Sequence, residues 1–227
     1  MKKKKAIVLV SGGLDSCVTA AIASRNYETY FLHTNYKQVT AKREKKAFLD
    51  IANYYNVKKK MIVDINYLQQ IGGSSLTDKD IKIYSETKDS IPNTYVPFRN
   101  ANLLAIAVAW AEVVGARAIF IGAMEEDSTG YPDCREEFFE KYNKMIELGT
   151  KPQTHIEVKT PIIHNAKSEV VKIGKKLKAP FRLTWSCYQN SRKACGMCES
   201  CKLRINAFKK AGLKDEIPYK IDIDWNN

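Results

Sequence analysis

Short runs of β-branched and other apolar residues alternate along this chain with longer segments whose apolar positions recur every three or four residues. A short, continuous apolar run is typical of a strand that is buried on both faces of a parallel sheet. The runs predict five strands, at Ala6–Val10, Thr29–His33, Met61–Ile65, Ala118–Ile121 and Ile156–Val158.

Helical periodicity fills the intervals between these runs. The segment Arg99–Val114 is apolar on nearly every side, which predicts a well-buried helix. Alternation of strands and helices predicts an α/β fold, with a parallel sheet and helices on both of its faces. The other predicted apolar stripes are Phe48, Ile51, Ala52 and Tyr55; Phe138, Tyr142, Met145 and Ile146; and Val170, Val171, Gly174 and Leu177.

Two stretches depart from this alternation. The segment Gly72–Pro97 has no clear period and is rich in Ser, Thr, Asp and Pro, and a long irregular segment inside a compact domain is usually functional or mobile. From Phe181 onward the chain contains most of its cysteines, a predicted short helix over Cys201–Ala211, and a tail near Trp225. We therefore predict a main domain over residues 1–180 and a small C-terminal metal-binding appendage over residues 181–227.

The composition is that of a globular protein, with 227 residues, 44% hydrophobic and 27% charged. The longest apolar run, Leu103–Ala111, is far shorter than the roughly 18 residues of a membrane-spanning helix. The apolar run Ala6–Val10 behind the basic N-terminus is too short for a signal peptide. We therefore expect a cytoplasmic protein.

Basic residues outnumber acidic ones by 37 to 25, for a formal net charge of +12. Such an excess favours an anionic partner such as a nucleotide, a phosphate or RNA. The lysines form scattered clusters at Lys2–Lys5, Lys58–Lys60 and Lys175–Lys178, which are also typical of a solvated surface. We do not expect direct RNA binding from charge alone.

The loop Ser11–Ser16 (Ser-Gly-Gly-Leu-Asp-Ser) follows the first predicted strand and opens the first predicted helix. Its glycines allow a close backbone approach to an anion, and the helix N-terminus offers unpaired N–H groups and partial positive charge. Ser11 and Ser16 add hydroxyls, and Asp15 is a candidate Mg²⁺ ligand or helix cap. The loop predicts a phosphate site, with an ordinary capped turn as the alternative. It is neither a Walker loop nor a G-x-G-x-x-G motif.

Four of the six cysteines have the spacing Cys187-x7-Cys195-x2-Cys198-x2-Cys201. Four thiolates in so short a segment suit tetrahedral Zn²⁺, and four sulfur ligands leave no coordination position open, so we predict a structural zinc site. An iron–sulfur cluster is the alternative, although the further cysteine of the bacterial ferredoxin run is missing. Cys17 and Cys134 stand apart, and we expect both to be small buried residues.

The complete loop Ser11–Ser16, directly after an apolar strand, resembles the loop of the PP-loop ATP pyrophosphatase superfamily. This resemblance implies a Rossmann-like fold of the adenine nucleotide alpha hydrolase type, and cleavage of ATP between its α- and β-phosphates. Three further segments and the cysteine cluster resemble the 7-cyano-7-deazaguanine synthase (QueC) family over essentially the whole chain. These segments are Tyr95–Asn100 (Tyr-Val-Pro-Phe-Arg-Asn), Ser128–Arg135 (Ser-Thr-Gly-Tyr-Pro-Asp-Cys-Arg) and Thr184–Tyr188 (Thr-Trp-Ser-Cys-Tyr). One departure is Lys37, where the family usually has glycine.

The family resemblance implies a two-stage reaction on 7-carboxy-7-deazaguanine. ATP first adenylates the carboxylate and releases pyrophosphate, and ammonia then displaces AMP to give a primary amide. A second ATP activates the amide oxygen, and loss of AMP leaves the nitrile of 7-cyano-7-deazaguanine, a queuosine precursor. No Cys/His/Glu glutaminase triad is apparent in the sequence, so free ammonia is the expected nitrogen source.

The same resemblance implies candidate site residues. The ATP-binding residues would be Val10, Ser11, Gly12, Gly13, Leu14, Asp15, Ser16 and Cys17. Charge on the α-phosphate must be absorbed by Mg²⁺ and cationic donors, for which the candidates are Asp15, Arg99, Arg135 and Lys167. The substrate candidates are Arg99, Asp127, Tyr131 and Asp133, because carboxylates accept the N–H groups of a deazaguanine and a phenol ring can stack on it. A helix-capping role is the alternative for both aspartates.

Three other readings remain open at this point. One is a PP-loop enzyme that modifies tRNA itself, and another is a paralogue that stops at the amide or uses a different acceptor. The third is a zinc-knuckle binding module without catalysis, against which the intact loop argues. A basic α/β enzyme of this size is often a dimer, so we expect a homodimer.

Overall fold

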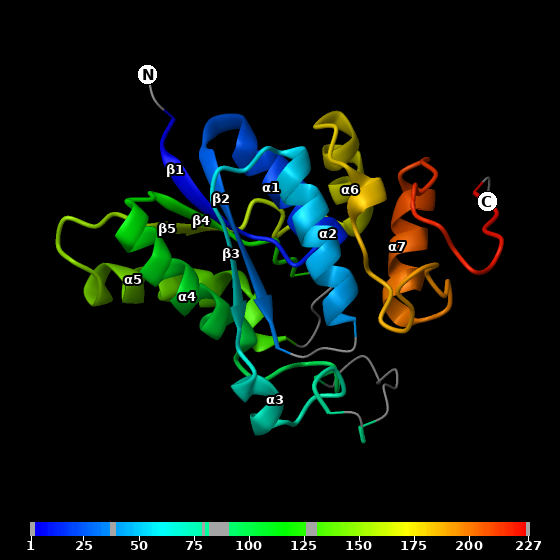
Figure 1. Cartoon of the computed structure of the whole chain (residues 1–227), viewed down its shortest axis with the longest axis horizontal. Coiled ribbons are helices and arrows are strands. Elements are labelled where there is room, and N and C mark those ends of the chain that lie inside the picture. The colour runs from blue at the N-terminus through cyan, green and yellow to red at the C-terminus, as the bar shows by residue number, and fades with distance from the viewer. Residues whose placement is uncertain (1–2, 37–39, 79, 82–90, 126–130, 226–227) are drawn as a thin grey trace.

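The protein is described by a computed structural model, which covers residues 3–36, 40–78, 80–81, 91–125 and 131–225. Five parallel strands form one sheet in the order β3-β2-β1-β4-β5 (Figure 1). The strands are β1 (Lys5–Leu9), β2 (Glu28–Asn35), β3 (Lys60–Asp64), β4 (Ala118–Phe120) and β5 (Glu157–Lys159). All five predicted strands are therefore confirmed, with shifted ends.

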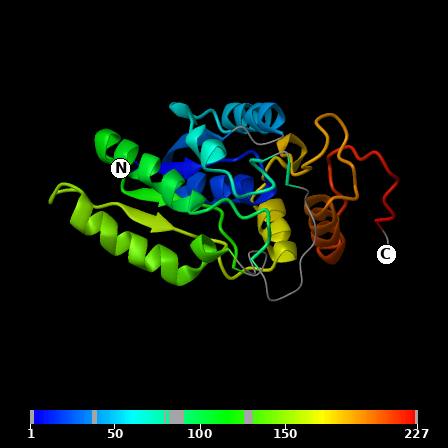
Figure 2. The ribbon, with the colours of Figure 1, turned by 90° about the horizontal axis from the view of Figure 1, so that it is seen from below.

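Helices cover both faces of the sheet, as the alternating pattern predicted (Figures 1 and 2). One face carries α1, α2 and α6, and the other carries α4 and α5. The helices are α1 (Leu14–Asn26), α2 (Ala41–Tyr54), α3 (Tyr67–Ile71), α4 (Arg99–Val114), α5 (Glu136–Gly149), α6 (Lys167–Lys176) and α7 (Glu199–Lys210).

The strands divide their apolar side chains between two cores because neighbouring residues of a strand point to opposite faces. On one face, Val8 and Phe31 pack with residues of α1, α2 and α6. On the other, Ile7 and Leu32 pack with residues of α4 and α5. Phe208 of α7 joins the first cluster, so the C-terminal helix shares the core of the main sheet.

Three details differ from the sequence predictions. β3 is an edge strand and is only half-buried, since no strand covers its outer side. α4 buries one face, which contains Leu104 and Ala107, whereas Val113 is 84% exposed. In α5 the buried stripe includes Phe139, while the predicted Met145 is 53% exposed. Composition alone overestimated burial because apolar residues also occupy outward-facing positions.

The strand order reverses between β1 and β4, which are neighbours in the sheet while their crossover helices lie on opposite faces. In doubly wound sheets, ligands bind outside the carboxyl ends of the strands at this reversal. The segment after α6 continues through residues 181–198 into α7 and lies beside that end of the sheet (Figure 1). In the part of the chain that the structure describes, no helix has both the length and the apolar character of a membrane span.

Candidate active site

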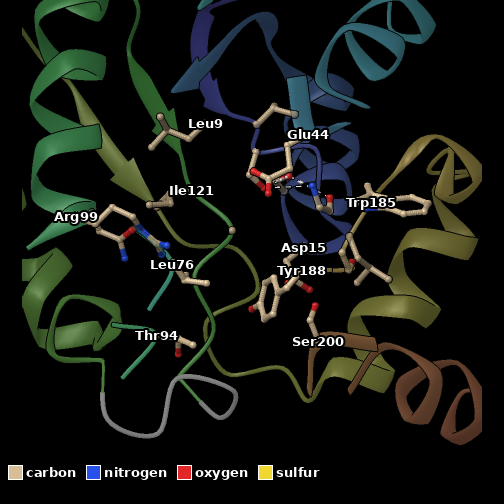
Figure 3. Close-up of a pocket in the computed structure, with 18 of the residues that line it drawn as sticks. Leu9, Asp15, Glu44, Leu76, Thr94, Arg99, Ile121, Trp185, Tyr188 and Ser200 are labelled. Carbon is tan, nitrogen blue, oxygen red and sulfur yellow. Dashed lines mark hydrogen bonds between the residues drawn. The ribbon is translucent and has the colours of Figure 1, made fainter. Parts of the chain in front are cut away.

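A cavity of about 410 Å³ lies at the carboxyl ends of β1 and β4 (Figure 3). Its walls come from the loop after β1, the ends of β2 and β4, the N-termini of α4 and α6, and the C-terminal segment. Residues far apart in sequence therefore meet at the position where a doubly wound sheet places its ligand.

The loop Ser11–Ser16 forms one wall of this cavity. The hydroxyl oxygen of Ser11 accepts a hydrogen bond from the backbone N–H of Gly13 at 3.2 Å and lies 3.1 Å from the hydroxyl of Ser16. The first turn of α1 has no side-chain cap, so its N–H groups are available to an anion.

Gly12 is the tightest point of the loop. Its φ of +95° lies in the left-handed region, and a Cβ at this position would lie 2.7 Å from the carbonyl oxygen of Glu44 in α2. Its own carbonyl accepts a hydrogen bond from the backbone N–H of Trp185 at 2.8 Å. The loop is thus fixed against α2 on one side and the C-terminal segment on the other.

Asp15 and Lys167 meet at the floor of the cavity, although 152 positions separate them in sequence. Asp15 Oδ2 lies 3.5 Å from Lys167 Nζ, at the N-terminus of α6. Asp15 Oδ1 is buried and has no hydrogen-bond partner among the described residues. A buried carboxylate oxygen without a partner is costly, and a bound cation would satisfy it.

Arg99 enters the cavity from the first position of α4, with Asn100 beside it. The preceding Phe98 adopts a left-handed conformation, φ 54°, that turns the chain into the helix. Asn100 donates from its backbone N–H to Asp133 Oδ2 at 2.8 Å and from its amide to the Asp133 carbonyl at 2.9 Å and to Cys134 Sγ at 3.2 Å. Two of the three segments that carried the family resemblance are therefore bonded to each other.

Neighbouring side chains stabilise the positively charged form of Arg99. Burial opposes this charge, but the phenol of Tyr36, the thiol of Cys134 and the carboxylate of Asp133 outweigh that effect and raise the pKa of the guanidinium. A cation that stays charged inside a cavity is suited to bind a carboxylate or phosphate.

Tyr131 also lines the cavity, and its hydroxyl lies 2.6 Å from Thr94 Oγ1. Its ring lies against that of Tyr95, with centroids 5.7 Å apart. Burial raises the pKa of Tyr131, so its phenol remains neutral at physiological pH.

The C-terminal segment supplies the opposite wall, as Figure 3 shows for Tyr188 and Ser200 across the opening from Arg99. Trp185 packs under the guanidinium of Arg43, 4.4 Å from the ring centroid. Behind this wall, Arg204 is 1% exposed and pairs with Asp215 at 2.6 Å. The C-terminal segment therefore contributes to the cavity in addition to the metal-binding role predicted from its cysteines.

The four cysteines Cys187, Cys195, Cys198 and Cys201 come together, with their sulfur atoms within 4.8 Å of one another. The sulfurs of Cys195 and Cys201 are 3.8 Å apart, and tetrahedral bonds of about 2.3 Å would place two thiolates at about this distance. Backbone N–H groups of Asn190 and Cys195 point at the Cys187 sulfur at 3.3 and 3.4 Å. This cluster could hold a metal ion, and its four sulfur donors leave no room for a substrate.

The structure does not bring every predicted site residue to the cavity. Arg135 is exposed, immediately before α5, and does not line the cavity. Asp133 is 3% exposed, does not line the cavity, and accepts a hydrogen bond from the backbone N–H of Asn100 in the first turn of α4. Cys17 is fully buried in the core, where desolvation raises its pKa to about 12. Asp127 and Lys37 lie outside the described residues.

Tyr36, Tyr188, Glu199 and Ser200 line the cavity but were absent from the sequence predictions. Tyr188 and Glu199 each directly follow a predicted metal ligand, and that adjacency was the signal that could have identified them.

The parallel sheet, its strand order and the glycine-containing loop at the reversal define a doubly wound α/β protein with a cavity at the carboxyl ends of its strands. The chain belongs to the QueC family, since the family model described as queuosine biosynthesis protein QueC matches residues 5–212. The family expected from the sequence is thus confirmed.

Curated relatives carry the name of an enzyme, 7-cyano-7-deazaguanine synthase, and this chain is an enzyme of the same family. A relative from Chlorobium phaeobacteroides (strain DSM 266) is 52% identical over 224 residues, which cover 97% of this chain and 99% of the relative. A relative from Nautilia profundicola is 52% identical over 219 residues, which cover 96% and 99%. Among solved structures, the NH3-dependent NAD synthetase from Campylobacter jejuni matches with a TM-score of 0.46 and 16% identity, over 81% of this chain and 68% of that chain.

Proposed function

We propose that this enzyme converts 7-carboxy-7-deazaguanine and ammonia into 7-cyano-7-deazaguanine at the expense of two ATP, each of which is split to AMP and pyrophosphate. The observation that carries the proposal is the loop Ser11–Ser16, with Asp15 and Lys167, facing the same cavity as Arg99. The name shared by the relatives supports the choice of product.

The loop and Lys167 would hold the phosphates of ATP. Free N–H groups at the start of α1 suit the terminal phosphates, and the Lys167 ammonium adds a point charge beside them. Asp15 would hold Mg²⁺, because its buried Oδ1 has no hydrogen-bond partner among the described residues. The metal would supply charge neutralisation on the phosphates.

Arg99 would bind the reacting carboxylate of the substrate. In the first stage this carboxylate attacks the α-phosphorus, the bond to the bridging oxygen breaks, and pyrophosphate leaves. Ammonia then attacks the acyl carbon, AMP departs with the former carboxylate oxygen, and a proton is released. In the second stage the amide oxygen attacks a new α-phosphorus, and elimination of AMP with loss of the remaining N–H protons leaves the C≡N bond.

Free ammonia would be the nitrogen donor. The two cysteines outside the metal cluster are both buried, and Cys17 has a raised pKa, which makes it a poor nucleophile for glutamine hydrolysis. Within the cysteine cluster, we propose that Zn²⁺ is the resident metal and has a structural role, because four sulfur donors match its preferred coordination.

The test is mass spectrometry of the products after incubation with ATP, Mg²⁺, ammonium and 7-carboxy-7-deazaguanine. Nitrile, with two AMP per nitrile, is the expected result. Accumulation of the amide would instead favour a paralogue that stops halfway. Absence of turnover in a protein that still binds ATP would contradict the proposal and favour an enzyme that acts on RNA, for which salt-sensitive tRNA binding is the assay.

A further inference from the structure

We propose that the guanine-like ring of the substrate binds against the C-terminal segment. In this arrangement Glu199 accepts hydrogen bonds from the ring N–H and the exocyclic amine, and Tyr188 packs on the ring face. The inference rests on the proposed function, since it concerns the same substrate.

A cluster of aromatic and charged side chains forms this part of the cavity. Tyr36, Tyr131 and Tyr188 all line it, together with Arg99 and Glu199. Within this cluster the Tyr131 hydroxyl lies 2.6 Å from Thr94 Oγ1, and its ring lies against that of Tyr95. Phenol rings beside an acceptor suit a flat heterocycle that carries N–H donors.

Glu199 is the acid in this wall that has no other role. Among the described lining residues the acids are Asp15, Glu44 and Glu199. Asp15 lies beside Lys167, and Glu44 accepts a hydrogen bond from Thr40 Oγ1 at 2.7 Å. No hydrogen bond or ion pair to the Glu199 side chain occurs within the described part of the chain, so its carboxylate is available to a ligand.

The shape and charge of 7-carboxy-7-deazaguanine complement a cavity that has Glu199 on one wall and Arg99 on another. Its 2-aminopyrimidinone edge presents two adjacent N–H donors, which one carboxylate can accept together. Its own carboxylate projects from the far side of the bicyclic ring. With the donor edge at Glu199, the reacting carboxylate would extend toward Arg99, which Figure 3 shows across the cavity from the wall that carries Tyr188 and Ser200.

In this arrangement the cysteine cluster would hold the two proposed binding residues in position. Tyr188 directly follows Cys187, and Glu199 directly follows Cys198. Both proposed contacts are therefore anchored by neighbouring residues whose sulfur atoms belong to one buried cluster. A rigid support of this kind holds binding groups in place without taking part in the chemistry.

The test uses the full-length enzyme and the Glu199→Gln variant in a pyrophosphate-release assay. We expect KM for 7-carboxy-7-deazaguanine to rise by about 10- to 100-fold, as for a lost charged hydrogen bond, while KM for ATP stays within about twofold. Glu216→Gln is the matched control, since Glu216 is an exposed acid of the same segment that does not line the cavity. Metal content and Tm of each variant would show that the cysteine cluster is intact.

A second measurement distinguishes a loss of substrate recognition from a general loss of enzyme structure. The substrate analogue that lacks the exocyclic amine should be used poorly by the native enzyme, and Glu199→Gln should lose most of this discrimination. Tyr188→Leu should weaken substrate binding, and Tyr188→Phe should restore it.

Normal substrate KM and normal discrimination in Glu199→Gln would overturn the inference while leaving the proposed function intact. An equal rise in KM for ATP, or a selective loss in Asp127→Asn with none in Glu199→Gln, would also overturn it. If the native enzyme neither binds nor converts the substrate, measured by equilibrium dialysis and by product analysis, the proposed function itself fails and the inference fails with it.

Discussion

The loop Ser11–Ser16 forms one wall of the cavity and the cysteine cluster lies in the segment that forms another, yet the two are built in opposite ways. The loop presents backbone N–H groups to an open cavity, and the buried Oδ1 of Asp15 has no hydrogen-bond partner in the part of the chain that the structure describes. The cluster turns four sulfur atoms toward one another, with backbone N–H groups behind them. Unsatisfied groups facing a cavity suit a ligand that arrives and leaves, whereas a closed donor set suits an ion that stays.

The two regions are also joined by direct contacts. The backbone N–H of Trp185 donates to the carbonyl of Gly12 at 2.8 Å, and the Trp185 ring packs under Arg43 of α2. Arg204 braces the segment from behind by donating to Thr184 Oγ1 at 2.8 Å and to Ser186 Oγ at 3.1 Å. A substitution that disrupts the cysteine cluster should therefore also alter the conformation of the loop Ser11–Ser16. A substitution that removes a charge from the loop should leave the structure of the cluster unchanged.

The largest effect on catalysis should come from Asp15→Asn. We expect pyrophosphate release to fall by at least about 100-fold, because the variant removes the carboxylate charge that would hold Mg²⁺ beside the phosphates. Metal content and Tm should remain within error of the native values. Asp222→Asn, an exposed change in the C-terminal tail, is the control. Full activity in Asp15→Asn would contradict the phosphate-site assignment.

Cys198→Ser should mainly affect stability. Loss of one of four ligands should release the metal and lower the free energy of unfolding by about 3 kcal/mol or more, or Tm by about 6–12 °C. Elemental analysis and calorimetry would measure both. Affinity for ATP should fall as a secondary effect through the Trp185 contact. Unchanged metal content would show that the four-sulfur site is not the metal site.

Gly12→Ala should distort the contact between the loop Ser11–Ser16 and the C-terminal segment. The left-handed φ and the predicted 2.7 Å contact with the Glu44 carbonyl should together cost about 1–3 kcal/mol of stability and distort the loop. Gly115→Ala is a matched control, because Gly115 also has a positive φ, of 67°, but a Cβ there would meet no atom within 4 Å. Thermal unfolding should detect both variants, while pyrophosphate release should fall only in Gly12→Ala.

The smallest expected effect is that of Trp185→Phe. This variant removes the indole hydrogen bond to the Asn190 carbonyl, 2.9 Å long, and leaves the backbone bond to Gly12 in place. We expect a loss of about 1 kcal/mol in stability and a rise of at most a few-fold in the Kd for ATP, measured by calorimetry. A much larger rise would show that the Trp185 side chain, rather than the backbone contact, transmits the effect of the cluster.

Much of the fold could be predicted from local patterns. Apolar runs and helical stripes located the five strands and the main helices because periodicity reflects which side chains must be buried. The short α3 (Tyr67–Ile71) was missed, since five residues are too few to show a period. The exposure of Val113 and Met145 was missed because composition does not reveal which helix face meets the sheet.

The candidate site likewise contains residues that could be predicted from the sequence and residues that could not. The loop Ser11–Ser16 and the four cysteines could be found because each is a compact motif whose donors are neighbours in sequence. The hydrogen bond of Asp133 to the start of α4 could not be predicted, since its partner Asn100 is 33 positions away and only the folded chain pairs them. Glu199 was missed because it looks like an ordinary acid in the first turn of a helix.

The sequence by itself determined the α/β class, the candidate phosphate loop, the four cysteines that could hold a metal ion and the family, because local spacing and side-chain chemistry carry that information. Only the tertiary structure decided that Lys167 meets Asp15, that Asp133 supports α4, and that the C-terminal segment forms a wall of the cavity. These contacts join residues from distant strands and helices, and packing of the sheet and its layers, rather than any local pattern, brings them together.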